Sequence, residues 1–147
     1  WLSSGEETQQ SMLMQPLSGT GRITAQIRME GAMQAGVGLK TGPEMKEGYY
    51  LYVETDRGRL VYRSWLRMSE DGGKTFPYDV ELEAPVRTPE DGRYLLEILM
   101  EGSMGTAYVN GEAALSFRMY DLKEGNLGLF SLGRAAFERI SLQKRRN

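Results

Sequence analysis

The sequence contains neither cysteine nor histidine. Without cysteine the chain can form no disulfide bond, no thiolate metal site and no cysteine nucleophile. This absence does not fix the compartment, because many secreted bacterial domains also lack cysteine. Without histidine the chain cannot assemble a serine triad, the usual zinc sites or a histidine acid–base. These chemistries are therefore excluded.

Long apolar runs and clusters of basic charge are also missing. No stretch approaches the roughly 20 apolar residues of a membrane span. The 18 lysine and arginine residues are scattered and the net charge is -2, so the chain lacks the electrostatic footprint of a nucleic-acid-binding protein. We therefore expect neither a membrane nor a nucleic acid as a partner.

The chain has 147 residues, a length typical of a single domain. A domain of this size buries roughly 70% of the surface that the unfolded chain exposes, so it can hold a core. Residues 21–31 show the clearest period-two alternation, in which Ile23, Ala25 and Ile27 alternate with polar side chains. Similar patterns predict strands at 11–15, 33–40, 48–54, 60–65, 80–85, 94–100, 106–110, 114–120, 125–130 and 135–142. We also expect a bulge at Glu138 and Arg139, where the alternation breaks. About eleven or twelve short strands without a helix predict an all-β fold, a two-sheet antiparallel β-sandwich of jelly-roll type.

The hairpin at residues 48–65 is the centre of this pattern. Alternation places Tyr49, Leu51 and Val53 toward the core, and turn residues follow at 56–58. The outward-facing residues of the hairpin include Tyr50, Tyr52, Glu54, Arg63 and Trp65. Aromatic rings beside a carboxylate and a guanidinium suit a sugar, because C–H faces stack on rings and vicinal hydroxyls take charge-assisted hydrogen bonds. An ordinary solvent-facing sheet surface fits the same pattern.

Residues 69–76, SEDGGKTF, have the spacing of an Asp-box. A single copy predicts a structural hairpin, with Asp71 and Phe76 as scaffold. No cofactor is predicted from the sequence. A structural calcium ion is an alternative, with Glu70, Asp71 and Glu90 as candidate oxygen ligands, but they lack D-x-D-x-D spacing.

Four segments together resemble a known family. They read GRITAQIRM, AGVGLKTGPEMKEGYYLYVETDRGRLV, GTAYVNGEAALSFRMY and GNLGLFSLGRAAFERISL, and they fall between residues 21 and 142. In pattern and order they resemble the concanavalin-A-like C-terminal sandwich modules of fructan-active family 32 glycoside hydrolases. Those modules are close to the levan-binding carbohydrate-binding modules of family 66.

This resemblance implies a non-catalytic module that binds levan-type fructan through the terminal fructosyl unit in a shallow pocket. It further implies that residues 1–147 are a single module of a larger glycoside hydrolase, with a catalytic domain in the same parent chain and a bacterial-type, secreted, extracellular location. Glu54 matches the acidic position of the family's Y-x-x-[IV]-[DE] strand. Where similar modules often have L-x-F-R, residues 37–40 read VGLK, so an arginine contact there is lost or passed to Lys40.

The predicted carbohydrate-binding residues are Tyr50, Glu54, Arg63, Trp65, Arg118 and Tyr120. We expect Glu54→Ala or Trp65→Ala to abolish binding while leaving the melting transition nearly unchanged. One alternative is a structural accessory sandwich of a glycoside hydrolase, with no ligand of its own. A glycosidase using two of Glu54, Glu81, Glu83 and Glu97 is less favoured. Glu81 and Glu83 fit a solvated strand face, and no second acid is expected beside Glu54.

Overall fold

The computed structural model describes residues 9–18, 20–42, 48–65, 81–119 and 124–144. Within these ranges it has eleven strands and no helix. The strands are β1 (Gln9–Ser18), β2 (Gly21–Met29), β3 (Gln34–Thr41), β4 (Gly48–Glu54), β5 (Arg59–Trp65), β6 (Glu81–Pro85), β7 (Arg93–Glu101), β8 (Met104–Val109), β9 (Ala113–Arg118), β10 (Glu124–Leu132) and β11 (Ala135–Lys144). The predicted Asp-box lies outside the described residues. In the part of the chain described here, no helix is long and apolar enough to cross a membrane.

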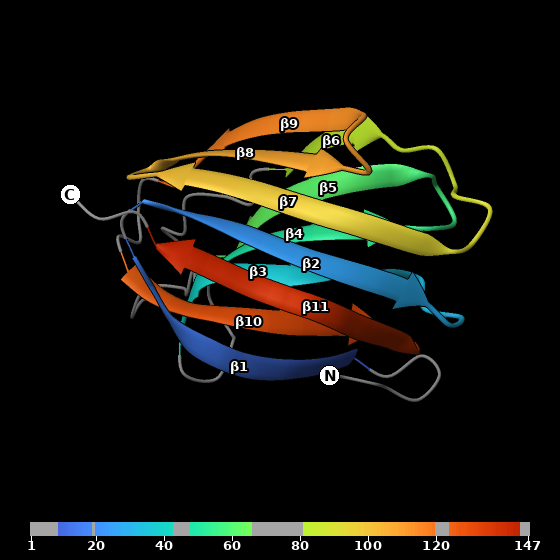
Figure 1. Cartoon of the computed structure of the whole chain (residues 1–147), viewed down its shortest axis with the longest axis horizontal. Coiled ribbons are helices and arrows are strands. Elements are labelled where there is room, and N and C mark those ends of the chain that lie inside the picture. Colours follow the sequence, from blue (N-terminus) through green and yellow to red (C-terminus); the bar gives the residue numbers. More distant parts are fainter. Residues whose placement is uncertain (1–8, 19, 43–47, 66–80, 120–123, 145–147) are drawn as a thin grey trace, which may run out of the picture.

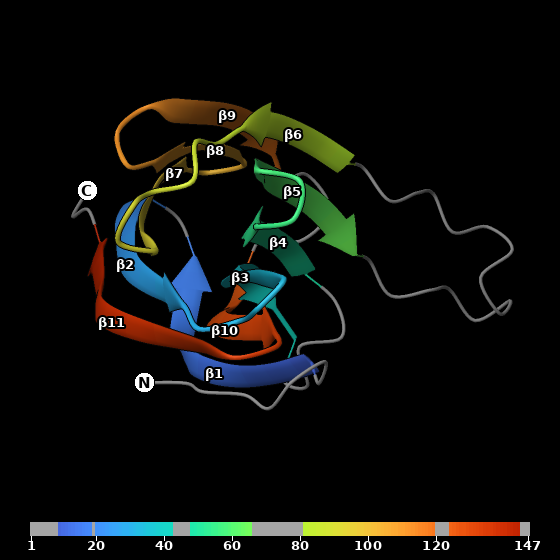
Figure 2. The ribbon, with the colours of Figure 1, turned by 90° about the vertical axis from the view of Figure 1, so that its right-hand side faces the viewer.

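The strands form two antiparallel sheets that pack face to face. The six-stranded sheet has the order β1-β10-β3-β4-β5-β6, and the five-stranded sheet has the order β11-β2-β7-β8-β9. Figure 1 looks onto the five-stranded sheet, with the six-stranded sheet behind it. Figure 2 shows the two layers from the end of the strands, with β6 and β9 side by side where they close one edge. The predicted two-sheet sandwich is confirmed.

The core lies between the two sheets and follows the predicted alternation. In β7, Leu96 and Ile98 are buried while Leu95 and Leu99 are exposed. Burial of each such large apolar side chain contributes about 1.5–3 kcal/mol. Tyr62 of the six-stranded sheet stacks on Phe117 of the five-stranded sheet, with ring centroids 4.5 Å apart. Its hydroxyl donates a hydrogen bond to the Arg118 carbonyl oxygen at 2.6 Å, so the buried ring keeps a polar partner and joins the sheets.

Two local irregularities match the sequence pattern. A Cβ on Gly36 would overlap the carbonyl oxygen of Leu51 on the neighbouring strand, so the missing side chain permits a close approach of the two backbones. The register of β11 against β2 shifts between Glu138 and Ser141. Arg139 has φ +50°, so the predicted bulge is confirmed.

Candidate functional site

A row of polar side chains crosses the outer face of the six-stranded sheet, where the β4–β5 hairpin turns. Gln34 of β3 is the register partner of Glu54 on β4, and Glu54 is the partner of Arg59 on β5. The hairpin turn is completed by Gly58, whose φ of +59° suits a residue without a side chain. Because β4 ends at Glu54 and β5 begins at Arg59, the turn itself places the two charges opposite each other.

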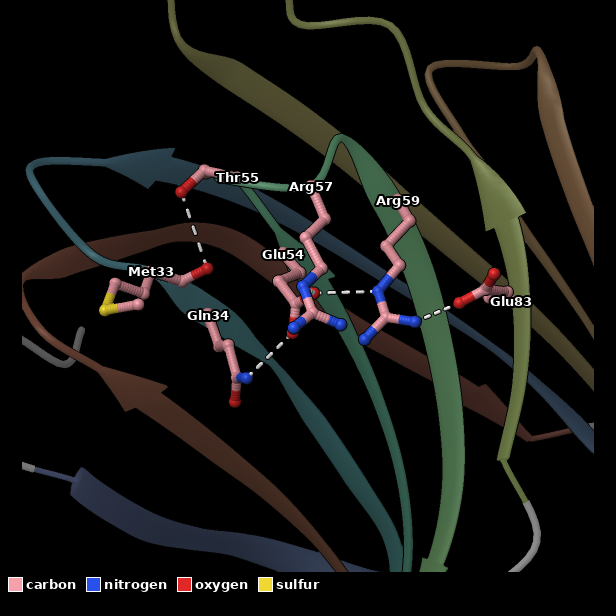
Figure 3. A network of polar contacts seen from close by, with 7 residues as sticks. All are labelled: Met33, Gln34, Glu54, Thr55, Arg57, Arg59 and Glu83. Atoms are coloured by element: carbon pink, nitrogen blue, oxygen red, sulfur yellow. Dashed lines mark hydrogen bonds and ion pairs between the residues drawn. The ribbon is translucent and has the colours of Figure 1, made fainter.

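The Arg59 guanidinium is held between two carboxylates. Its Nε donates to Oε1 of Glu54 at 2.7 Å, and its Nη1 donates to Oε2 of Glu83 on β6. Oε2 of Glu54 accepts a hydrogen bond from Nε2 of Gln34 at 3.0 Å. Nε of Arg57 lies 3.6 Å from Oε1 of the same carboxylate. Figure 3 shows these side chains converging from four strands and the turn.

The centre of this network is buried and its rim is open. Glu54 is 6% exposed, whereas the side chains of Glu83 and Arg57 are 58% and 67% exposed. Burial alone would raise the pKa of Glu54, but the hydrogen bond and positive charge of Arg59, with help from Gln34 and Arg57, outweigh it and lower that pKa. The hydrogen bond from Arg59 to Glu54 raises the pKa of Arg59 in turn. Both groups are therefore charged at neutral pH.

The turn that carries the network is anchored to the loop between β2 and β3. The backbone N–H of Thr55 donates to the Met33 carbonyl oxygen at 3.0 Å, and the Thr55 hydroxyl donates to the Ala32 carbonyl oxygen at 3.1 Å. Met33 lies at the rim of the network with 45% of its surface exposed (Figure 3). These bonds fix the turn, and with it the position of Arg59.

An aromatic patch lies next to the network on the same outer face. Phe130 of β10 makes edge-to-face contacts with Tyr50 and Tyr52 of β4, at centroid distances of 5.4 and 5.5 Å. Phe130 can reach across β3 because its register partner there is Gly36, which has no side chain. The side chain of Val61 packs against these rings and is included in what we call the aromatic patch. Tyr50 is only half-buried, so part of this residue stays accessible.

The structure brings three of the six predicted binding residues to this outer face. Tyr50 and Arg63 are register partners across β4 and β5, and Glu54 lies further along β4. Trp65 pairs with Gly48 through its backbone, but its side chain is not described. Tyr120 lies outside the described residues. Arg118 is exposed on β9 of the other sheet, so the structure does not bring it together with Tyr50 and Glu54.

Two expectations about Glu54 need correction. Its carboxylate is on the outer face but is covered by its partners, so removing it would leave the largely buried Arg59 with only the exposed Glu83 as an acidic partner. An unchanged melting transition for Glu54→Ala does not follow from this geometry. An acid also lies near Glu54 after all, since Glu83 shares Arg59 with it. A carboxylate with a lowered pKa is a poor general acid, so this pair does not favour glycosidase chemistry.

Sequence reasoning missed Gln34, Arg59 and Phe130, and it considered Glu83 only as an alternative catalytic acid on a solvated strand face. Arg59 had a local signal, because a hairpin with its turn at residues 55–58 makes it the direct partner of Glu54. The other three belong to strands outside the hairpin, and their positions depend on sheet register. Glu97, also considered as an acid, pairs with Arg22 at 2.6 Å on the five-stranded sheet.

The structure gives no support to a metal site in the residues it describes. Among them, no three acidic side chains gather as a cation would require. Glu90 lies exposed in the loop before β7, and Glu70 and Asp71 are outside the described ranges. The calcium alternative therefore stays untested.

Two antiparallel sheets packed face to face, with charged and aromatic side chains on the outer face of the larger sheet, define a β-sandwich domain. The structure is similar to the carbohydrate-binding module CBM66 from Bacillus subtilis, with a TM-score of 0.77, 15% identity, and coverage of 96% of this chain and 84% of that one. It is also similar to a toad ovary galectin solved with thio-digalactose, with a TM-score of 0.67, 10% identity, and coverage of 92% and 98%.

An exo-inulinase from Aspergillus awamori contains the same fold within a longer chain. The TM-score is 0.62 at 12% identity, and the match covers 92% of this chain but 29% of the inulinase. No protein-family model matches the sequence, and a comparison with curated proteins finds no match. At these sequence identities the similarities show that this chain shares its fold with the three proteins, and nothing further.

Proposed function

We propose that this chain is a non-catalytic carbohydrate-binding module and that its site is the outer face of the six-stranded sheet around Arg59. One observation carries the proposal. A guanidinium is held between two carboxylates, beside an aromatic patch that includes the partly buried Tyr50. Solved structures of this fold include a carbohydrate-binding module and a galectin in complex with thio-digalactose, which supports the same function here.

The physical basis is a prearranged set of donors, acceptors and apolar surface. Arg59 is already oriented by Glu54 and Glu83, so little side-chain entropy is lost when a sugar binds. Charge-assisted hydrogen bonds to hydroxyl groups contribute about 1.5–3 kcal/mol each. Contact of a sugar's C–H face with Tyr50 adds on the order of 1 kcal/mol. Because few atoms are buried in so open a site, affinity should lie in the micromolar to millimolar range.

The finer specificity we propose is levan-type fructan, bound through its terminal fructosyl unit. It is supported by the sequence resemblance to fructan-associated modules and by the occurrence of this fold in an exo-inulinase. In this proposal Tyr50, Arg63 and Trp65 contact the sugar, while Glu54 positions Arg59. The module would be secreted and would target an attached glycoside hydrolase to its polymer.

Affinity electrophoresis through gels containing levan, inulin, xylan, β-glucan or no polymer tests this function. Levan should retard the wild-type domain. Glu83→Gln and Tyr50→Leu should weaken retardation about tenfold, the equivalent of roughly 1.4 kcal/mol. Glu112→Gln is the matched control, because it makes the same charge change on an exposed turn outside the site. Retardation by another polymer alone would keep carbohydrate binding but reject fructan.

A structural accessory sandwich without a ligand is the second candidate. It is favoured by the internal pairing of Glu54, whose two oxygens already take bonds from Arg59 and Gln34. It also fits the presence of the fold as part of a longer enzyme chain. Under this alternative no polymer in the gels retards the wild-type domain, and Glu83→Gln, Tyr50→Leu and Glu112→Gln all migrate as it does.

A further inference from the structure

A hollow lies on the outer face of the five-stranded sheet, where β7 ends and β8 begins. It encloses about 530 Å³, and its lining includes Arg22, Leu99, Glu101, Met104, Thr106 and Gln143. In Figure 1 this is the left end of the front sheet, whereas the β4–β5 turn lies at the right end of the rear sheet. The hollow and the Arg59 site thus lie on opposite faces and at opposite ends of the molecule.

The register explains why these side chains share one surface. Gln143, Arg22, Leu99 and Thr106 are successive partners across β11, β2, β7 and β8, so they form a straight row on the outer face. In the adjacent row, Glu101 pairs with Met104, and Met104 pairs with Arg118 of β9. Arg118 therefore lies on this face, next to the hollow.

The chemistry of the hollow resembles that of the Arg59 site. Nη2 of Arg22 donates to Oε2 of Glu97 at 2.6 Å, yet 51% of the Arg22 side chain is exposed, so the guanidinium is oriented and still accessible. Leu99 and Met104 are 47% and 48% exposed and provide an apolar floor. Thr106 and Gln143 supply neutral donors and acceptors around it.

We propose that this hollow is a second carbohydrate-binding site, which takes a short neutral oligosaccharide. Sugars alternate C–H patches with hydroxyl groups, and the row matches them with Leu99 and Met104 beside Arg22, Thr106 and Gln143. Arg22 is balanced by Glu97 and Glu101 nearby, which disfavours an anionic ligand. None of the residues named in this lining is aromatic, so binding is weaker here than beside Tyr50. The inference rests on the proposed function for its ligand class.

The test is a titration of the ¹⁵N-labelled domain with levanbiose, lactose or cellobiose at millimolar concentration. Binding is measured from the changes in backbone amide chemical shifts. The binding sugar should move two separate groups of signals, one from β4 and β5 and one around Leu99 and Thr106. Arg22→Gln should weaken the second group at least fivefold and leave the first unchanged. Met104→Gln, which alters the apolar floor instead of the charge, should act in the same way.

Arg28→Gln is the matched control, because Arg28 lies on the same strand and also pairs with glutamates, Glu30 and Glu138, away from the hollow. It should affect neither group. Shifts in the first group alone would overturn the second site and leave the proposed function standing. Shifts around the hollow alone would support the second site and reject the location proposed for the first. No shifts with any of the sugars would overturn both.

Discussion

Glu54 is a buried carboxylate on the outer face of the six-stranded sheet. Its two oxygens are occupied by Arg59 and Gln34, and the guanidinium it holds is itself only 14% exposed at the side chain. Such a pair is costly to break, because the remaining partner keeps a charge that neither water nor protein fully compensates. Glu54 thus supports the position of Arg59.

Glu54→Gln should therefore lower the free energy of unfolding by about 3 kcal/mol. The amide keeps the shape of the side chain but removes the charge opposite Arg59. Glu83→Gln is the comparison, because Glu83 meets the same guanidinium with 58% of its side chain exposed, and its loss should cost less than about 1 kcal/mol. Urea denaturation measures the loss of unfolding free energy in both variants. Equal, small effects would show that Arg59 is well solvated without Glu54.

The lowered pKa of Glu54 also predicts how stability depends on pH. An unfolded glutamate has a pKa of about 4.3, and the folded carboxylate titrates below its usual value. The unfolded state therefore takes up the proton first as the solution is acidified. The stabilisation from Glu54 is complete above the unfolded pKa and is lost as the pH falls through the folded pKa.

The difference in unfolding free energy between wild type and Glu54→Gln should accordingly be constant near neutral pH and shrink below about pH 4. Urea denaturation at a series of pH values measures it. A difference that stays constant down to pH 2 would mean that the ionised carboxylate does not contribute through its pairing with Arg59.

At the scale of elements, Gly36 lets β3 approach β4 closely. A Cβ at position 36 would collide with the backbone of β4, at the Leu51 carbonyl oxygen and the Tyr52 Cα. Gly36 is also the position that Phe130 crosses to reach the tyrosines of the aromatic patch. The same missing side chain thus permits the close approach of β3 to β4 and the formation of the patch.

Gly36→Ala should consequently destabilise the domain by more than about 3 kcal/mol, or prevent folding, because backbone atoms cannot move aside as a flexible side chain can. Gly111→Ala is the control, since its φ of +71° is strained for alanine but no atom lies within 4 Å of the added Cβ. It should cost about 1 kcal/mol. Similar losses for the two variants in thermal denaturation would argue against the predicted collision.

At the scale of the whole molecule, ligand binding should appear as added stability. A sugar that binds only the folded state, at 100 times its dissociation constant, adds about 2.7 kcal/mol. For a domain of this size that raises the melting temperature by about 5–10 °C. Differential scanning fluorimetry measures this shift in melting temperature, with fructan oligosaccharides in the sample and the same buffer without sugar as the reference. No shift with any sugar would favour the structural accessory alternative.

Much of the fold could be predicted from the sequence because strands are local patterns. Period-two alternation identified β2, β4, β5 and β7, and the broken alternation near Arg139 identified the bulge in β11. The shared outward face of Tyr50 and Arg63 followed from one hairpin, because a short turn limits the register of the strands it joins.

The site was predicted less completely because three of its residues, Gln34, Glu83 and Phe130, lie on strands outside the β4–β5 hairpin. Gln34 and Glu54 are 20 residues apart, and Arg59 and Glu83 are 24 apart, so only the strand order brings them together. Alternation correctly placed Arg118 outward, but it could not say from which of the two sheets. That is why Arg118 was grouped with Tyr50.

The sequence by itself determined the fold class, the inward and outward faces of most strands, and the absence of cysteine and histidine chemistry. Each of these depends on composition or on neighbours along the chain. Only the tertiary structure decided that Arg59 lies between Glu54 and Glu83, and that Arg22 and Leu99 share a hollow on the opposite sheet. Those contacts arise from register between distant strands, which is set by the packing of the whole sandwich.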